Sequence, residues 1–125
     1  MRNKYSSIKN SILALLSKTK SPLSVAEIME IITANKTTVY RDLASLINDG
    51  LVKELDFGDR TKRYETSSLG HHHHLICRNC KKIEEVKIKD VFEDKEKDLE
   101  KRTGFKSIEH NLEFYGTCAK CLRDN

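Results

Sequence analysis

Two Cys-x-x-Cys pairs, Cys77/Cys80 and Cys118/Cys121, place the strongest constraint on how this chain of 125 residues can fold. Each pair presents two thiolates from a tight turn, and two such pairs together complete a tetrahedral Zn²⁺ site. A site of four cysteines leaves no open coordination position, which indicates a structural role. Residues 81–117 separate the pairs, which is more than a simple zinc ribbon needs. A small folded unit is therefore expected to be clasped between them.

Two disulfides, free thiols or a thioredoxin-like redox pair are the alternatives for these cysteines. The N-terminal segment MRNKYSSIKNSILALLSK lacks a continuous apolar stretch and a small-residue cleavage site, so we expect no signal peptide. No apolar stretch approaches the ~20 residues that span a bilayer. We therefore expect a cytoplasmic protein without membrane contact, in which cysteines bind metal more often than they form disulfides. No βαβ pattern surrounds either pair, which argues against a redox motif.

Four consecutive histidines, His71–His74, run almost directly into the first cysteine pair. Their position inside the chain argues against a purification tag. Side chains alternate along a strand, so His71 and His73 should point to one face and His72 and His74 to the other. The pattern predicts two metal sites on opposite faces, the alternative being a solvated polar strand end. The residues available to complete these sites are Glu65, Glu84, Glu85, Glu93 and His110.

His110 stands among apolar residues in the segment FKSIEHNLEFYG, where Ile108, Leu112 and Phe114 alternate with polar side chains. The alternation predicts a strand with these residues and His110 on one face. A histidine on such a face requires a partner. Two partners are compatible with the sequence: a metal ion, or a hydrogen-bonding group within the core.

The first half of the chain contains three helical patterns followed by a hairpin. Ser24-Val-Ala-Glu27 is a capping box that opens the second helix. The third helix is predicted from about Thr37 to Asn48, with Gly50 as a left-handed cap. Two strand-like runs then flank a Phe57-Gly58-Asp59 turn. The apolar positions of the three helices are Ile8, Ile12, Leu15 and Leu16, then Val25, Ile28 and Ile32, then Val39, Leu43, Leu46 and Ile47. This order of elements is that of a winged helix-turn-helix.

The third helix is the candidate DNA-reading element. Its early exposed residues combine cations, hydroxyls and one aromatic ring, which suit phosphates and base edges in a major groove. Residues 1–66 carry 11 Lys and Arg against 8 Asp and Glu, so the positive charge excess lies mainly in this half. The alternative is a solvated basic surface. The candidate DNA-binding residues are Lys36, Thr37, Thr38, Tyr40 and Arg41 on the helix, with Arg60, Lys62 and Arg63 on the wing.

The second half is predicted to be a small α/β unit. The polar segment ETSSLG ends in glycine and indicates a hinge, which gives domains at 1–66 and 71–125 with the hinge at 67–70. HHHLIC and KIEEVKI are strand-like, residues 90–103 are helical, and Gly104 ends that helix. The predicted fold is therefore α+β: a winged helix-turn-helix domain plus an α/β dimerisation domain clasped by zinc.

Three ordered motifs, which together span nearly the whole chain, resemble the ferric uptake regulator family of metal-dependent repressors. TTVYRDLASLINDGLV resembles the recognition helix of the family, and HHHHLICRNCKKIEEV resembles its H-H-x-H-L-x-C-x-x-C metal core. HNLEFYGTCAKC resembles its closing strand and second cysteine pair. The resemblance implies a homodimer that binds an inverted-repeat DNA operator when a regulatory divalent metal is loaded.

The same resemblance implies a role for each candidate ligand. Structural zinc would be bound by Cys77, Cys80, Cys118 and Cys121. The regulatory site between the domains would comprise Glu65, His72, His74 and Glu85. A second site within the dimerisation domain would comprise His71, His73, Glu93 and His110, where Glu93 requires one inserted residue in the preceding loop. Tyr40 would contact a base and Arg41 a phosphate. The regulatory metal would be Zn²⁺ or Fe²⁺, with Mn²⁺ and Ni²⁺ as further candidates.

Three departures from the family pattern bear on sensing. Pro22 occupies the position before the second helix from which the family often supplies a histidine. His73 replaces the aspartate of iron-type members, whereas Ser67 stands where zinc-type members have a cysteine. The segment Thr33–Asn35 between the second and third helices is short.

Two other classes of function are open. An open zinc position could activate water in a hydrolase, but no H-E-x-x-H and no nucleophile–base set accompany the histidines. We therefore expect no enzyme and no small-molecule substrate. A zinc-stabilised DNA-binding protein that senses nothing is the third class.

Overall fold

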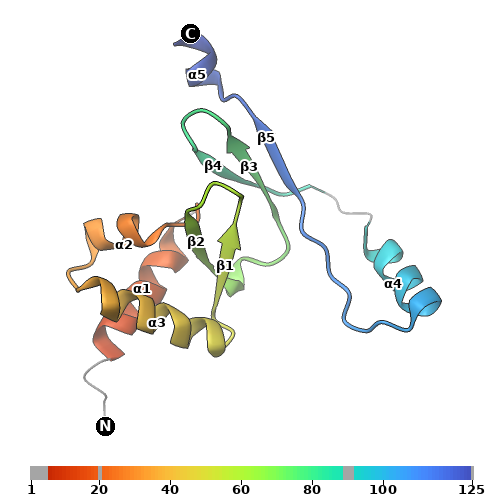
Figure 1. Ribbon diagram of the computed structural model, residues 1–125, viewed down its shortest axis with the longest axis horizontal. Helices are drawn as coiled ribbons and strands as arrows, with labels where there is room; N and C mark the ends of the chain where they lie inside the picture. Colours follow the sequence, from red (N-terminus) through yellow and green to blue (C-terminus); the bar gives the residue numbers. More distant parts are fainter. Residues whose placement is uncertain (1–5, 20, 89–91, 125) are drawn as a thin grey trace. The chain divides into compact units, whose positions relative to one another are not determined.

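The computed structural model describes residues 6–19, 21–88 and 92–124. The chain divides into two compact units, Met1–Gly70 and His71–Asn125, called the first and second units below. Both combine helices with a β-sheet, so the α+β class predicted from the sequence is confirmed (Figure 1). Among the described residues, none of the helices is both long enough and apolar enough to cross a bilayer.

The first unit consists of three helices followed by a two-stranded hairpin, in the predicted order (Figure 1). A single 3-10 turn, Ser67–Leu69, follows the hairpin. The helices are α1 (Ser6–Lys18), α2 (Val25–Ile31) and α3 (Lys36–Asn48), and the strands are β1 (Val52–Asp56) and β2 (Lys62–Thr66).

Side-chain and backbone caps define the ends of α2 and α3. The predicted capping box is confirmed: the Glu27 N–H donates to Ser24 Oγ at 3.2 Å, and the Ser24 N–H donates to Glu27 Oε1 at 2.9 Å. α3 begins at Lys36, next to the predicted start near Thr37, and the Asn35 side chain caps it by accepting the Thr38 N–H at 2.8 Å. Gly50, with φ 77°, adopts the predicted left-handed conformation just after α3.

One apolar core holds the helices against the hairpin. Val39, Leu43 and Leu46 line the buried face of α3 at helical spacing, as the sequence predicts. Full burial of such side chains contributes roughly 1.5–3 kcal/mol each. The core comprises Ile12, Leu16, Val25, Ile28, Val39, Leu43, Leu46, Val52 and Tyr64, with Ile8, Leu15, Ile32 and Ile47 partly buried around it.

The hairpin is extended by one residue from outside its two strands. β1 and β2 pair antiparallel, from Val52 opposite Thr66 to Asp56 opposite Lys62. Leu23 and Tyr64 then exchange two backbone hydrogen bonds of 3.0 and 2.8 Å, which ties the segment before α2 to β2. The hairpin is therefore anchored to the helical layer by backbone as well as by core contacts.

The hinge-like segment at 65–70 is only partly irregular. Glu65 and Thr66 lie inside β2, where ladder hydrogen bonds to β1 keep them extended. Thr66 also caps the 3-10 turn by accepting the Ser68 N–H at 3.4 Å. Gly70 has φ 77°, which glycine adopts at no steric cost. The segment predicted to be a hinge therefore contains the end of β2 and a capped turn followed by one glycine.

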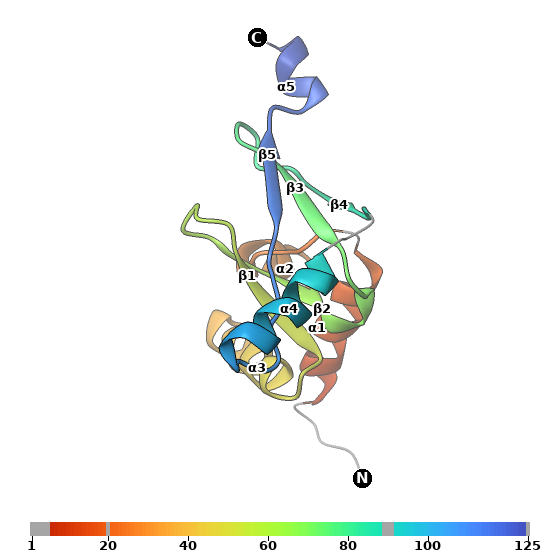
Figure 2. The ribbon, with the colours of Figure 1, turned by 90° about the vertical axis from the view of Figure 1, so that its right-hand side faces the viewer.

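The second unit consists of a three-stranded sheet with one helix of three turns and a short C-terminal helix. The strand order is β4-β3-β5, with β3 antiparallel to β4 and parallel to β5 (Figure 2). Residues 90–91 of the predicted helix lie outside the described residues. The elements are β3 (His73–Cys77), β4 (Ile83–Val86), α4 (Phe92–Thr103), β5 (Glu113–Gly116) and α5 (Ala119–Arg123).

The strand predicted across FKSIEHNLEFYG is wrong over most of its length. β5 begins only at Glu113, and residues 105–112 belong to no strand. The sheet provides the reason: Glu113 lies level with His74 and β3 begins at His73, so β3 extends past this pair by one residue only. Burial alternates only as far as Leu112: Ile108, His110 and Leu112 are partly buried, with exposed residues between them. At β5 Glu113 is partly buried and Phe114 is exposed, so the predicted placement of Phe114 on the same face is wrong.

Candidate metal centres and nucleic-acid interface

Turns at one end of the second unit bring the four cysteines together. The first pair occupies the turn between β3 and β4, and the second caps and enters α5. Cys77 Sγ lies 3.8 Å from Cys121 Sγ, and Cys80 Sγ lies 3.8 Å from Cys118 Sγ. All four sulfur atoms lie within 4.8 Å of one another. A tetrahedron with Zn–S bonds of about 2.3 Å has S···S edges of about 3.8 Å, so this donor set fits Zn²⁺.

Backbone amides around this cluster stabilise thiolates. The N–H groups of Cys118 and Cys80 donate to Cys77 Sγ at 3.4 and 3.5 Å and lower the pKa of that thiol to about 6. The Cys121 N–H likewise lowers the pKa of Cys118. The Asn79 side chain lowers the pKa of Cys121, but the neighbouring thiols and burial outweigh it and raise the value to about 11. Deprotonated sulfur is the form that binds metal.

The odd-numbered histidines gather with His110. The ring centroids of His71 and His73 are 4.8 Å apart, and that of His110 lies 5.2 Å from His71 and 5.6 Å from His73. One ligand atom from each lies within 4.8 Å of the others. Three imidazoles that converge in this way could hold a transition-metal ion.

The even-numbered histidines form a separate pair. His72 Nε2 lies 3.2 Å from His74 Nε2. Glu85 Oε2 lies 3.9 Å from His72 Nδ1, and Glu85 stands directly opposite His74 in the β3–β4 ladder. Residues opposite one another in antiparallel strands share a face of the sheet. Glu85 therefore accompanies the even pair.

Two of the candidate carboxylates, Glu84 and Glu93, pair with lysines instead of joining a histidine cluster. Glu84 points to solvent and pairs with Lys82 at 3.2 Å. The Glu93 side chain is 76% exposed and pairs with Lys97 at 3.6 Å, so it is not brought to the odd-numbered histidines. Glu96 takes that place, with Oε2 2.7 Å from His110 Nδ1. Glu96 is not among the candidates predicted from the sequence, although it stands three residues after Glu93, on a neighbouring turn of the predicted helix. Glu65 belongs to β2 of the first unit.

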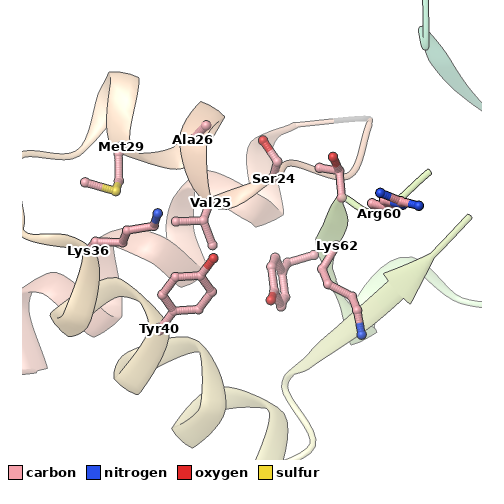
Figure 3. Close-up of a pocket in the computed structure, with 10 residues that line it drawn as sticks. Ser24, Val25, Ala26, Met29, Lys36, Tyr40, Arg60 and Lys62 are labelled. Carbon is pink, nitrogen blue, oxygen red and sulfur yellow. The ribbon is translucent and has the colours of Figure 1, made fainter. Parts of the chain in front are cut away.

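The predicted DNA-binding residues of α3 are accessible. Tyr40 is 48% exposed, and the Arg41 side chain is 63% exposed beside Asp42. Lys36 and Tyr40 point from α3 into a pocket whose other walls are α2 and the hairpin (Figure 3). The pocket measures about 550 Å³, and Arg60 and Lys62 line its hairpin side. This surface therefore combines cations with an aromatic ring in one concave region. Thr37 is exposed and Thr38 is partly exposed at the start of the same helix.

One predicted wing residue serves the fold instead. Arg63 is buried and forms two contacts with Asp59, at 2.9 Å (Nη2–Oδ2) and 3.2 Å (Nη1–Oδ1). Its guanidinium also lies 5.9 Å from the centroid of the Phe57 ring. The expectation that Arg63 lies exposed on the wing is therefore wrong, because Asp59, in the turn between β1 and β2, pairs with it through both carboxylate oxygens and holds it inward.

This ion pair predicts a pH-dependent stability of the hairpin loop. The Arg63 hydrogen bond holds the pKa of Asp59 below its usual value against the opposing effect of burial. A depressed pKa adds stability above the unfolded pKa, near 4, that is lost as pH falls through the folded value. Asp59→Asn should therefore lower the free energy of unfolding by about 1 kcal/mol at pH 7 and by less at pH 3. Urea denaturation of the full chain, followed by circular dichroism, measures both.

Glu30→Gln is the matched control, since it removes one negative charge from an exposed position on α2. Equal destabilisation by Asp59→Asn at both pH values would contradict an electrostatic role for the pair.

A comparison with protein families matches residues 2–115 to the Ferric uptake regulator family. Among curated relatives, the Ferric uptake regulation protein of Bacillus subtilis (strain 168) is 38% identical over 87 residues. The Peroxide operon regulator of the same organism is 39% identical over 86 residues. The matches cover 67% and 69% of this chain and 58% of each relative, so the chain spans about three-fifths of their length.

Solved structures agree with the fold. The Helicobacter pylori ferric uptake regulator Fur, described as having three functional metal binding sites, superposes with a TM-score of 0.78 at 25% sequence identity. The alignment covers 98% of this chain and 83% of that structure.

Proposed function

Because this chain belongs to the Ferric uptake regulator family, we propose that it is a metal-responsive DNA-binding transcriptional repressor that acts as a homodimer. Its target would be an inverted-repeat operator in double-stranded DNA, bound when a regulatory divalent metal is loaded. The observation that carries the proposal is the division of the four histidines into two clusters, beside a third cluster of four thiols. The H. pylori regulator with three functional metal binding sites supports this comparison.

The three clusters would have different tasks. The four cysteines would hold structural Zn²⁺ and clasp the second unit. His71, His73 and His110 would hold an ion within that unit. His72, His74 and Glu85 would form the regulatory site together with Glu65, which precedes the 67–70 segment in the chain whereas the histidines follow it. A metal bound by residues on both sides of this segment would favour one angle between the units over others.

Metal response then requires only differential affinity. An effector shifts an equilibrium between two arrangements by the difference in its affinity for them. Ligands that all belong to the second unit would bind the metal with the same affinity in both arrangements. A set that includes Glu65 of the first unit would bind it with different affinities. Since Pro22 stands where the family often supplies a histidine, Glu65 is the first-unit ligand to which this proposal assigns the response.

The donor atoms of the proposed regulatory site limit which divalent metals it would bind. Imidazole with carboxylate suits Zn²⁺ and Fe²⁺, and Mn²⁺ and Ni²⁺ are compatible with the same atoms. An enzyme is not favoured, because the matched relatives are named as regulators. The alternative is a zinc-stabilised DNA-binding protein that senses no metal. Titration with metal distinguishes the two, because only a metal-responsive protein should change its DNA affinity.

The DNA-binding part of the proposal predicts a salt effect. A duplex selected from a random pool with Zn²⁺ present serves as the probe, and its affinity is measured with and without each divalent cation. Arg41→Ala and Lys36→Ala should weaken binding to all duplexes and reduce the slope of log K against log[salt] by about one unit per lost phosphate contact. Tyr40→Phe should instead change the preference among duplexes.

Lys101→Ala, an exposed cation on α4, is the control and should change neither quantity. An Arg41→Ala protein with unchanged affinity and salt slope would show that α3 is not the DNA-reading helix. If the DNA affinity of the parent protein does not depend on zinc, the alternative of a zinc-stabilised DNA-binding protein that senses no metal is favoured.

A further inference from the structure

One face of α4 packs against residues 108–110 through side chains spaced four residues apart. The Phe92 ring centroid lies 5.0 Å from that of His110. Glu96 Oε2 lies 2.7 Å from His110 Nδ1. Glu100 Oε2 accepts the Ile108 N–H at 3.3 Å. Positions i, i+4 and i+8 share a helical face, so these three contacts define a single rotational setting of α4.

Glu93 lies off this face. Its side chain is 76% exposed and pairs with Lys97 one turn later, at 3.6 Å. A rotation of α4 that turned Glu93 toward His110 would move Phe92, Glu96 and Glu100 away from their partners. The geometry therefore selects Glu96 over the carboxylate expected from the family pattern.

The 2.7 Å contact also indicates which atom carries the proton. A carboxylate only accepts hydrogen bonds, so His110 Nδ1 is the donor and Nε2 of the neutral ring keeps its lone pair. A histidine that binds metal commonly donates its second ring N–H to a carboxylate, which orients the ring and increases its basicity. The side chains of His110 and Glu96 are both 22% exposed, so the pair is partly shielded from water.

We propose that Glu96, and not Glu93, is the acidic partner of the His71–His73–His110 site, where it orients His110 and leaves three imidazoles as the protein ligands of a divalent transition metal. This inference rests on the proposed function for the existence of the site. A set of three imidazoles favours Zn²⁺ or Co²⁺ over Mn²⁺, which prefers oxygen ligands. Glu96 is thus a positioning residue, and its loss should weaken metal binding without removing a ligand.

The test compares two alanine substitutions three residues apart on one helix. Glu96→Ala and Glu93→Ala are made in a full-length His72→Ala/His74→Ala background, which silences the other histidine pair. Each protein, loaded with one equivalent of Zn²⁺ for its four cysteines, is titrated with Co²⁺, whose visible spectrum reports occupancy of the imidazole site. Glu96→Ala should weaken Co²⁺ binding about 10- to 100-fold, the typical cost of losing an outer partner. Glu93→Ala should leave the affinity within about twofold.

Glu96→Gln supplies a further readout, because its amide oxygen still accepts the His110 N–H without charge. It should recover part of the affinity lost in Glu96→Ala, which a merely structural role of the carboxylate would not predict. Circular dichroism checks that α4 is retained in every variant.

Loss of affinity in Glu93→Ala equal to or larger than that in Glu96→Ala would overturn the inference, as would unchanged affinity in both. The titration contains no DNA. If these variants show the expected Co²⁺ pattern while the parent protein, with His72 and His74 intact, shows no metal-dependent DNA binding, the proposed function is refuted and the Glu96 assignment stands.

Discussion

Replacing Cys118 with serine should release the proposed structural zinc ion, disorder residues 71–125 and abolish the proposed homodimer. Zinc binding contributes about 10–16 kcal/mol in small zinc domains, because the unfolded chain has no preformed site. The second unit has little else to replace that energy: among its described residues, the buried apolar side chains are Ile76, Cys77, Ile83 and Cys121. Two of these four are themselves members of the thiol cluster. Metal analysis, light scattering and circular dichroism of the full chain report the three losses.

Ala119→Ser is the matched control, because it introduces the same residue one position later, at an exposed site on α5. It should retain zinc and the dimer. A well-folded dimeric Cys118→Ser protein with its full zinc content would rule out the four-cysteine assignment. The first unit should survive the substitution, since the described residues of its core all lie between Ile8 and Tyr64.

The second large effect concerns His74. We expect His74→Ala to abolish metal-dependent DNA binding while the dimer stays intact. The even-numbered histidines would share their ion with Glu85 and Glu65, and only such a set reports on the arrangement of the units. Allosteric coupling is typically about 1–3 kcal/mol, or about 5- to 150-fold in affinity, and this whole gain should disappear. DNA affinity is measured against free Zn²⁺, Fe²⁺ and Mn²⁺.

The matched comparisons are His73→Ala, on β3 next to His74, and His110→Ala, in the irregular segment before β5. They remove one imidazole each from the odd-numbered cluster and should mainly lower the melting temperature of the second unit, with a smaller effect on the metal response. Equal loss of response from odd- and even-numbered substitutions would mean one shared site, and the alternation argument would fail.

Local rules accounted for most elements of the first unit. Apolar spacing located three helices, the capping box located the start of α2, and Gly50 located the end of α3. Two details required the structure. Asn35 caps α3, which the sequence did not reveal, and Arg63 turns inward toward Asp59 rather than outward toward a ligand. A cap and an ion pair both depend on whether a side chain finds its partner, and a residue type alone does not specify that.

In the second unit the sequence by itself determined the donor chemistry. Thiol spacing indicated one tetrahedral site, and strand alternation separated odd- from even-numbered histidines, because both depend on short stretches of backbone. The structure alone decided where β5 begins, since a strand needs a neighbouring ladder and β3 starts only at His73. It also decided that Glu96 and not Glu93 meets His110. The rotation of α4 is set by long-range packing of its whole face against residues 108–110, and no local pattern in the chain encodes that rotation.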